Sequence, residues 1–371
     1  MNEKEWLEST IKKLSDKMAV VSQRSQLKLP FTSADGMHDD NSFKITQWTN
    51  GFWGGMLWLM FMLTEDEHYR DLAIQHEKKL DDAFLNFERL NHDVGFLWMP
   101  TAGLHYKLEK NEDSLRRLYF AACSLASRFH VKGQFFRAWN KDPGYSCIID
   151  CLLNIPLLYV MSEELDDPRF RLMAMAHADT VMEQHIREDG SIIHISTHDP
   201  QTGEVTGYQA GQGYDVDSAW SRGQAWAIYG YAISYMHTGE KRYLDMAKKT
   251  ANYFLASCCD DYLPRCDFRA PAEPLVYDAS AGAIAACGML DIAAHCGDLD
   301  AEKYAGGAMR ILQAMEANFC DWSEDTDFIL TNSSRRYGVM TPNGRNVPII
   351  FGDYFFIEAI LHLQKPEIRF W

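Results

Sequence analysis

The pattern of hydrophobic and polar positions predicts a chain made almost entirely of helices. Apolar residues recur at a spacing of three and four through most of the sequence, whereas the strict alternation typical of strands is nearly absent. The best strand candidate is the short run Ile192–Ile195. The fold class is therefore predicted to be all-α.

The predicted helices are of two kinds that alternate along the chain. Amphipathic helices with one charged face are typical of a surface, and helices that are apolar all round are typical of an interior. The predicted outer helices span Glu5–Val21, Glu67–Phe87, Ser114–Phe129, Pro168–Ile186, Lys241–Ala256 and Ala301–Phe319. The predicted inner helices span Gly51–Leu63, Val94–Leu108, Cys147–Met161, Gly223–His237, Ala279–Ala294 and Tyr354–Leu363, the second of them interrupted by Pro100 and Gly103.

Six outer and six inner helices in alternation indicate an (α/α)6 barrel, which we expect to form a single domain over residues 1–371. An open α-solenoid is the alternative, but it usually has a tighter repeat and polar capping repeats. Long loops precede the inner helices, and such loops are uncommon unless they are functional. If the inner helices are parallel, these loops meet at one end of the barrel. They span residues 35–50, 133–146, 189–221, 260–278 and 332–353.

The composition excludes some partners. A net charge of −16 argues against nucleic acid and anionic membranes, because both require a basic surface. We read no signal peptide and no transmembrane run. The nine cysteines fall mostly in apolar segments, which favours free thiols and a cytoplasmic location. No CxxC pair is present, so we predict no metal site.

Asp150 is the first candidate for chemistry. It lies in the apolar run Tyr145–Val160, which we interpret as one helix. Desolvation of a carboxylate is costly, so the pKa of Asp150 should be raised towards a value useful for giving and taking protons. The alternative is a structural residue that caps or bridges to a neighbour.

Other polar and aromatic residues gather at the expected entrances of the inner helices. Tryptophans beside carboxylates are typical of a saccharide-cleaving pocket. Asp278 and Asp353 each precede a helix and are interpreted as N-caps. Arg222 gains nothing from a helix N-terminus, so we expect it to face a carboxylate or an anionic ligand.

Six motifs in this order resemble the unsaturated glucuronyl hydrolases of glycoside hydrolase family 88. Together they extend from about residue 45 to residue 365. They are Trp48–Met56, Asn91–Phe96, Tyr145–Cys151, Asp199–Gly203, Ser218–Trp226 and Gly352–Phe355.

The resemblance implies an (α/α)6 barrel, which agrees with the alternation of helices. It also implies a substrate, an oligosaccharide that ends in a 4,5-unsaturated uronic acid, and a reaction that hydrates the C4=C5 vinyl ether. The hemiketal so formed collapses and releases the next sugar. The resemblance implies no metal and no cofactor, and we expect a monomer or a weak homodimer.

By the same resemblance, Asp150 is the proton donor and acceptor, and Asp93 stabilises the positive charge that develops at C5. His194 is preferred to His198 as a residue of the uronate site. The residues expected to contact the substrate are Trp48, Trp139, His194, Gln212, Trp220, Arg222, Trp226 and Tyr337.

Three alternatives remain open. The first is the related unsaturated rhamnogalacturonyl hydrolases of family 105, which act on pectin fragments. The second is a sugar 2-epimerase on an α/α barrel, which should depend on paired histidines, and the third is a non-catalytic protein that binds acidic saccharides. The substrate is also open among chondroitin, hyaluronan, heparin and gellan fragments. The cluster Ser333–Arg336 offers a sulfate site, although a solvated loop is the preferred interpretation.

Overall fold

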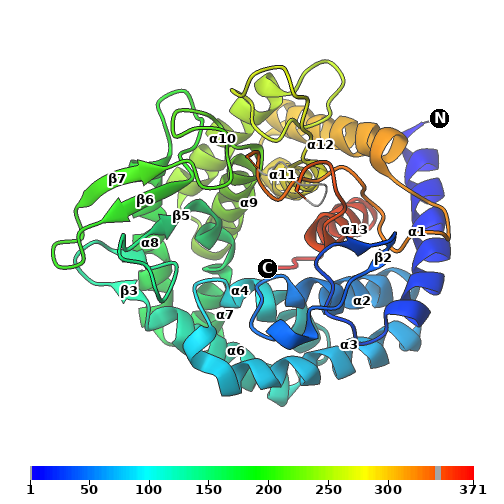
Figure 1. Ribbon diagram of the computed structural model, residues 1–371, viewed down its shortest axis with the longest axis horizontal. Coiled ribbons are helices and arrows are strands. Elements are labelled where there is room, and N and C mark those ends of the chain that lie inside the picture. Colours follow the sequence, from blue (N-terminus) through cyan, green and yellow to red (C-terminus); the bar gives the residue numbers. More distant parts are fainter. Residues whose placement is uncertain (1, 339–343) are drawn as a thin grey trace.

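The computed structural model describes residues 2–338 and 344–371, so residues 339–343 of the last expected loop lie outside it. Its helices form two concentric rings, and the end of the chain lies inside the inner ring (Figure 1). The outer ring consists of α1 Glu3–Ser25, α3 Glu67–Lys79, α6 Glu112–Ala126, α8 Pro168–His185, α10 Lys241–Ser257 and α12 Asp298–Phe319. The inner ring consists of α2 Asn50–Thr64, α4 Val94–Trp98 with α5 Leu104–Glu109, α7 Pro156–Leu165, α9 Ser221–Thr238, α11 Ala279–Ala294 and α13 Ile350–Gln364. The predicted (α/α)6 barrel is confirmed.

The inner ring closes because its first and last helices touch. Helix α13 packs against α2 on one side and against α11 on the other, and α11 packs against α9. Small residues permit this close approach. A Cβ atom on Gly51 of α2 would lie 2.2 Å from the carbonyl oxygen of Phe96 in α4, so only glycine fits at this contact. Closure excludes the open solenoid.

Two inner segments differ from the prediction. The segment Val94–Leu108 consists of α4, a π-helical turn at Met99–Gly103 and α5, as its proline and glycine indicated. The prediction of one helix over Cys147–Met161 is wrong in its first half. Cys147–Ile148 form strand β5, Ile149–Leu153 form a 3₁₀ turn (η4), and α7 begins at Pro156. Proline at the first helical position is well placed to begin α7.

The strands belong to small antiparallel sheets in the loops. Figure 1 shows the largest of them at one side of the rings, in the order β5–β6–β7. The expected strand near Ile192 begins later, at Ile195, because pairing with β5 fixes its register. The other bounds are β1 Ser33–Ala34, β2 Met37–His38, β3 Phe129–His130, β4 Phe135–Phe136, β6 Ile195–His198, β7 Val205–Gln209, η1 Ser42–Lys44 and η2 Leu80–Arg89. Within the described ranges, no helix has the length and apolar character needed to cross a membrane.

The C-terminal segment covers the end of the barrel where the inner helices finish. The indole Nε1 of Trp371 donates to the Glu358 carboxylate over 3.1 Å, and the ring of Trp371 stacks on Phe355. Lys107 donates to the carbonyl oxygen of Arg369 over 2.6 Å. One end of the barrel is thus filled by the chain itself, and the loops gather at the other end.

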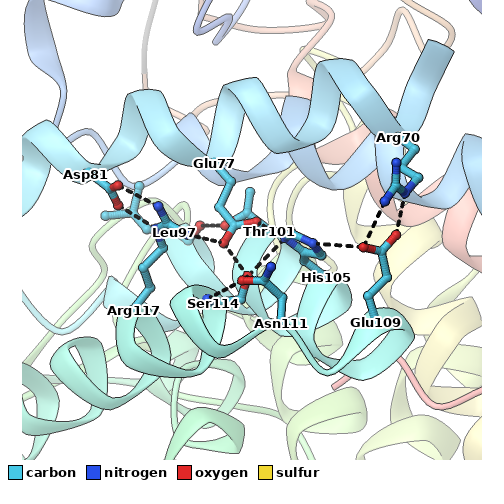
Figure 2. Close-up of polar contacts among 10 residues, drawn as sticks. All are labelled: Arg70, Glu77, Asp81, Leu97, Thr101, His105, Glu109, Asn111, Ser114 and Arg117. Carbon is cyan, nitrogen blue, oxygen red and sulfur yellow. Dashed lines mark hydrogen bonds and ion pairs between the residues drawn. The ribbon is translucent and has the colours of Figure 1, made fainter. Parts of the chain in front are cut away.

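A buried polar network joins the outer helix α3 to α5 and α6 (Figure 2). Glu77 of α3 is 1% exposed, and its carboxylate contacts Arg117 at 2.9 Å, Ser114 at 2.6 Å and His105 at 2.7 Å. Arg117 also forms a two-pronged ion pair with Asp81. A buried carboxylate requires such partners, so this network fixes how three helices pack.

Replacement of Glu77 by Gln should lower the free energy of unfolding by about 3 kcal/mol, because Arg117 loses a buried counter-charge and one acceptor oxygen becomes an NH2 group that faces a donor. Urea unfolding followed by circular dichroism measures the change. Glu67→Gln is the matched control, since the Glu67 side chain is 68% exposed where it meets Arg70, and it should cost less than about 1 kcal/mol. Equal losses in the two variants would contradict this role for Glu77.

Candidate active site

A cavity of about 460 Å³ opens where the inner segments begin. Eight of the ten site residues predicted from the sequence line it, and they come from segments far apart in the chain. A larger cavity of about 640 Å³ beside α6 has a single carboxylate, that of Glu88, and so lacks a pair of acids. The eight are Trp48, Asp93, Trp139, Asp150, His194, Gln212, Arg222 and Trp226.

Asp150 lies in the η4 turn between β5 and α7, and two backbone contacts and the side-chain amide of Asn154 hold this turn in place. Strand β5 pairs with β6, and the amide of Ile149 donates to the carbonyl oxygen of His194 over 3.1 Å. The Asn154 amide lies 3.4 Å from the Asp150 carbonyl oxygen, and its Oδ1 accepts from the amide of Phe96 in α4. The Asp150 side chain is 21% exposed, so its carboxyl group faces the cavity.

Asp93 lies on the loop just before α4 and is 7% exposed. The backbone N–H of Asp93 donates to Oδ1 of Asn91 over 2.8 Å. The neighbouring amide of His92 donates to the carbonyl oxygen of Ala138. These contacts hold the Asp93 carboxyl group near Asp150, and one carboxyl oxygen from each lies within 4.8 Å of the other.

The environment favours the protonated form of both acids. Burial raises the pKa of Asp93 to about 7, against the weaker effects of Asn91 and Arg128. Burial, together with the charge of Asp93, raises the pKa of Asp150 well above its ordinary value, against the attraction of Arg222. A cation bound beside them and His92 would have to displace these protons. The pair therefore has the properties of a proton-transfer site.

Two backbone groups contact Nδ1 of His194. The N–H of Gln212 donates to it over 3.0 Å, and the carbonyl oxygen of Ala210 lies 3.1 Å from it, so these contacts hold the ring in place. Burial lowers the pKa of His194 to about 3, which keeps the ring neutral. A Cβ on Gly211, whose φ is +59°, would lie 2.2 Å from Nδ1. The ring of His194 is therefore held in a fixed position at the cavity, and His198 is elsewhere, bonded to Ser196 and Gly203.

Arg222 has a carboxylate partner within the protein. Its guanidinium forms a buried ion pair with Asp278 and donates to the carbonyl oxygens of Ser334 at 2.7 Å and Arg335 at 3.1 Å. The N-cap interpretation of Asp278 is thus wrong, because its side chain makes no cap bond. The N-cap interpretation is also wrong for Asp353, which lies inside the first turn of α13. Its carboxylate accepts from the backbone amides of residues 329 and 330.

The predicted aromatic walls are only partly as expected. Trp139 lines the cavity and is 40% exposed, whereas Trp226 lines the cavity but is buried. Trp220 and Tyr337 do not line the cavity. Trp220 lies behind His194, with ring centroids 4.1 Å apart, and its ring also faces the Arg222 guanidinium. The amide of Tyr337 donates to the carbonyl oxygen of Gln212. Both residues support the lining from outside.

Sequence reasoning missed several lining residues. His92 lies next to Asp93 in the motif Asn91–Phe96, but it is not among the residues that the sequence predicts for the site. Arg336 was given to a solvated loop, yet it lines the cavity, and Ser333 and Ser334 beside it are buried. Gln209, at the end of β7, carried no signal, because only the pairing of β6 and β7 brings it to this end of the barrel.

Comparison with known proteins agrees with this geometry. The profile of glycosyl hydrolase family 88 matches residues 11–263. The unsaturated glucuronyl hydrolase of Bacillus sp. (strain GL1) is 36% identical over 88% of each chain. The unsaturated chondroitin disaccharide hydrolase of Streptococcus pyogenes serotype M1 is 34% identical over 90% of this chain and 86% of its own. The structure of a UGL variant with dGlcA-Glc-Rha-Glc has a TM-score of 0.90 at 31% identity, covering 96% of both chains.

The relatives and the family show that the chain is a glycosidase, and the pair of acids beside aromatic side chains at the open end of the (α/α)6 barrel agrees with this class. The chain belongs to glycosyl hydrolase family 88, and the relatives that it matches over most of its length are unsaturated glucuronyl and unsaturated chondroitin disaccharide hydrolases. The family resemblance and the enzyme class predicted from the sequence are thus confirmed.

Proposed function

We propose that the protein removes the 4,5-unsaturated glucuronyl residue from the non-reducing end of oligosaccharides left by polysaccharide lyases, and that it does so by hydrating the C4=C5 bond. The observation that carries this proposal is the geometry of the cavity, where Asp150 lies with a carboxyl oxygen within 4.8 Å of a carboxyl oxygen of the buried Asp93; burial raises the pKa of Asp150, in agreement with this role. Hydration of a vinyl ether requires an acid first and a base next, at one place.

In the proposed reaction, the Asp150 carboxyl group gives its proton to C4 while the ring oxygen shares the positive charge that develops at C5. Asp93 lies within reach to stabilise that charge. Water then adds to C5, and its proton goes to the Asp150 carboxylate, so that Asp150 ends as it began. The product is a hemiketal, whose ring opens and releases the next sugar.

The other lining residues have supporting roles in this proposal. His194 offers a ring nitrogen to a substrate hydroxyl or to the attacking water, since its contacts with Gln212 and Ala210 hold the ring in place. Arg222 is already paired with Asp278, so its charge is largely used within the protein. Its contact with Gln212, at 3.4 Å, lets Arg222 hold the lining of the uronate site in place. In this proposal the same guanidinium also contacts the uronate. Trp139, the most exposed aromatic of the cavity, is suited to stack on the second sugar.

We propose a glycosaminoglycan-type substrate, as one relative's name, unsaturated chondroitin disaccharide hydrolase, suggests. Arg336 lines the cavity, and Arg335 lines an adjacent one of about 260 Å³ that also contains Arg222. The hydroxyl groups of the neighbouring serines are used inside the protein. A sulfated sugar would therefore depend on the arginines.

The remaining features of the proposal concern the whole chain. We propose that residues 1–371 act as one catalytic domain, in the cytoplasm, as a monomer or weak homodimer. The excess of acidic residues supports an absence of nucleic-acid and membrane partners.

The direct test is incubation with unsaturated disaccharides and measurement of the ultraviolet absorbance of the conjugated enol ether. Hydration destroys this chromophore, so the absorbance should fall with time. A panel of sulfated and unsulfated glycosaminoglycan disaccharides, with a pectin-derived unsaturated disaccharide as the comparison, measures the preference. Turnover of the pectin fragment alone would favour the activity of family 105. Binding without loss of absorbance would favour a non-catalytic saccharide-binding protein.

A further inference from the structure

The imidazole of His92 lies between the two buried acids. Its side chain is 1% exposed. Nε2 lies 3.4 Å from Oδ1 of Asp93, and Nδ1 lies 3.8 Å from Oδ1 of Asp150. The hydrogen bond from the backbone N–H of His92 to the carbonyl oxygen of Ala138 holds the loop in place, so the position of the ring does not depend on either acid. The mechanism above gives this ring no task.

Two buried atoms of this cluster lack hydrogen bonds. Nδ1 of His92 and Oδ1 of Asp150 are both enclosed, and neither has a partner among the described residues. Such atoms are rare, because an unmade bond in the interior costs free energy. The two atoms face each other, so one proton between them would satisfy both, after a movement of less than about 1 Å. With the single N–H of the neutral imidazole on Nε2, on the side of Asp93, that proton comes from Asp150.

We propose that His92 is a positioning residue that decides which of the two acids holds their shared proton. It accepts from the protonated Asp150 at Nδ1 and donates to the Asp93 carboxylate from Nε2. The resting enzyme therefore has Asp150 as the acid and Asp93 as the anion. This inference rests on the proposed function, since it assigns the proton required at C4 to Asp150.

The same arrangement serves the second half of the reaction. Once Asp150 has given its proton to C4, Nδ1 of His92 has no proton to offer to the new carboxylate. The proton of the attacking water is then the one available on that side, and Asp150 takes it. His92 gains and loses no net proton in the cycle, so the proton balance is that of the hydration itself.

The charged surroundings keep the imidazole neutral. Burial and the charge of Arg128 lower the pKa of His92 to about 3, below the range in which the acids titrate. Arg222 from α9 acts on Asp150, and the thiols of Cys147 and Cys151 lie near it with raised pKa values. The pKa of His177 in α8 is lowered by burial and by nearby histidines, His92 among them. The titrations expected in this cluster are therefore those of Asp93 and Asp150, whose pKa values are raised by burial, and not that of His92.

The test is the pH dependence of kcat in His92→Phe, which keeps the ring volume and removes both nitrogens. In the wild type, kcat should follow a bell whose limbs report the first and second protons of the acid pair. Without its donor, the Asp93 carboxylate is protonated more easily, so the acidic limb rises by about one pH unit. Without its acceptor, Asp150 loses its proton more easily, so the basic limb falls by about one pH unit. The pH range over which His92→Phe is active should therefore be narrower at both its acidic and its basic end.

Two further variants separate the nitrogens. The amide of Asn reaches the place of Nδ1, so His92→Asn should restore the basic limb and leave the acidic limb shifted. The amide of Gln reaches the place of Nε2, so His92→Gln should restore the acidic limb alone. The matched control is His362→Phe at the closed end of the barrel. His362 is also buried with a pKa lowered to about 4, and it lies 3.6 Å from the carboxyl of Asp291. Its replacement should leave both limbs unchanged.

A measurement without substrate separates this inference from the proposed function. Carboxyl carbon-13 NMR of labelled aspartate in the free enzyme should show the pKa of Asp93 rising and the pKa of Asp150 falling in His92→Phe. These shifts support the role of His92 even if no disaccharide is turned over, which would refute the proposed function alone. A folded His92→Phe protein with unmoved limbs and unmoved carboxyl titrations overturns the inference. If that variant does not fold, the same comparison is made between His92→Asn and His92→Gln, and identical profiles overturn it.

Discussion

Replacement of Asp150 by Asn lowers kcat by about 10⁴-fold, the upper range for a general acid or base, because one carboxyl group serves both steps of the proposed hydration. The amide is nearly the same size and the site is already roomy enough to expose 21% of the side chain, so the fold should be kept. KM should change little, since the substrate is held mainly by the cavity walls. The loss is measured from the decay of the enol-ether absorbance under saturating disaccharide.

The matched control is Asp291→Asn in α11. Asp291 is also buried and its pKa is raised to about 7 by burial, but it lies near the end of α11 that is closed by the C-terminal segment. Asp291→Asn should retain kcat within a factor of two or three. If Asp150→Asn kept the wild-type rate, Asp150 would not be the proton donor. If Asp291→Asn lost as much as Asp150→Asn, a general effect of removing buried charge would explain both.

The largest loss of stability is expected from Asp278→Asn. This change leaves the Arg222 guanidinium buried, 2% exposed, without its counter-ion. Removal of one partner of a buried ion pair costs about 3–5 kcal/mol, and two carbonyl oxygens offset only part of that charge. Activity should also fall, because Arg222 contacts Gln212, which holds His194. Urea unfolding measures the first effect and kcat/KM the second.

The control for that loss is Asp179→Asn, which removes the carboxylate of a surface pair with Arg242. Exposed pairs contribute less than about 1 kcal/mol, so this variant should unfold near the wild-type urea concentration. The double variant Arg222→Met with Asp278→Leu should recover most of the stability, since apolar residues can replace a buried pair. It should not recover activity. Equal stability of Asp278→Asn and Asp179→Asn would show that the Arg222 pair is not needed for the fold.

Identification from the sequence depended on features that are local in the chain. The alternation of charged and apolar helices predicted the two rings, because the period of 3.6 residues records which face each helix buries. Asp150 was found because a carboxylate in an apolar run is unusual, and Asp93 because its motif resembles one of family 88. The family followed from the order of six such motifs.

The error at Asp150 shows where local reasoning stops. Its apolar neighbours fit a helix, but pairing of Cys147 and Ile148 with β6 is a contact across about fifty residues, and it turns the backbone into a strand and a 3₁₀ turn. Apolar runs in a fully buried strand and in a buried helix look alike, so tertiary contacts decide between them.

The sequence by itself determined the class of fold, the family and the two acids, since each is recorded in residue types and their spacing. Only the tertiary structure decided which partner each charged or polar group has. It paired Arg222 with Asp278, put Trp220 behind His194 and Tyr337 outside the cavity, and placed His92 between the two acids. Hydrogen bonds and ion pairs act over a few ångströms, and the groups that meet in this cavity are separated by up to hundreds of residues in the chain.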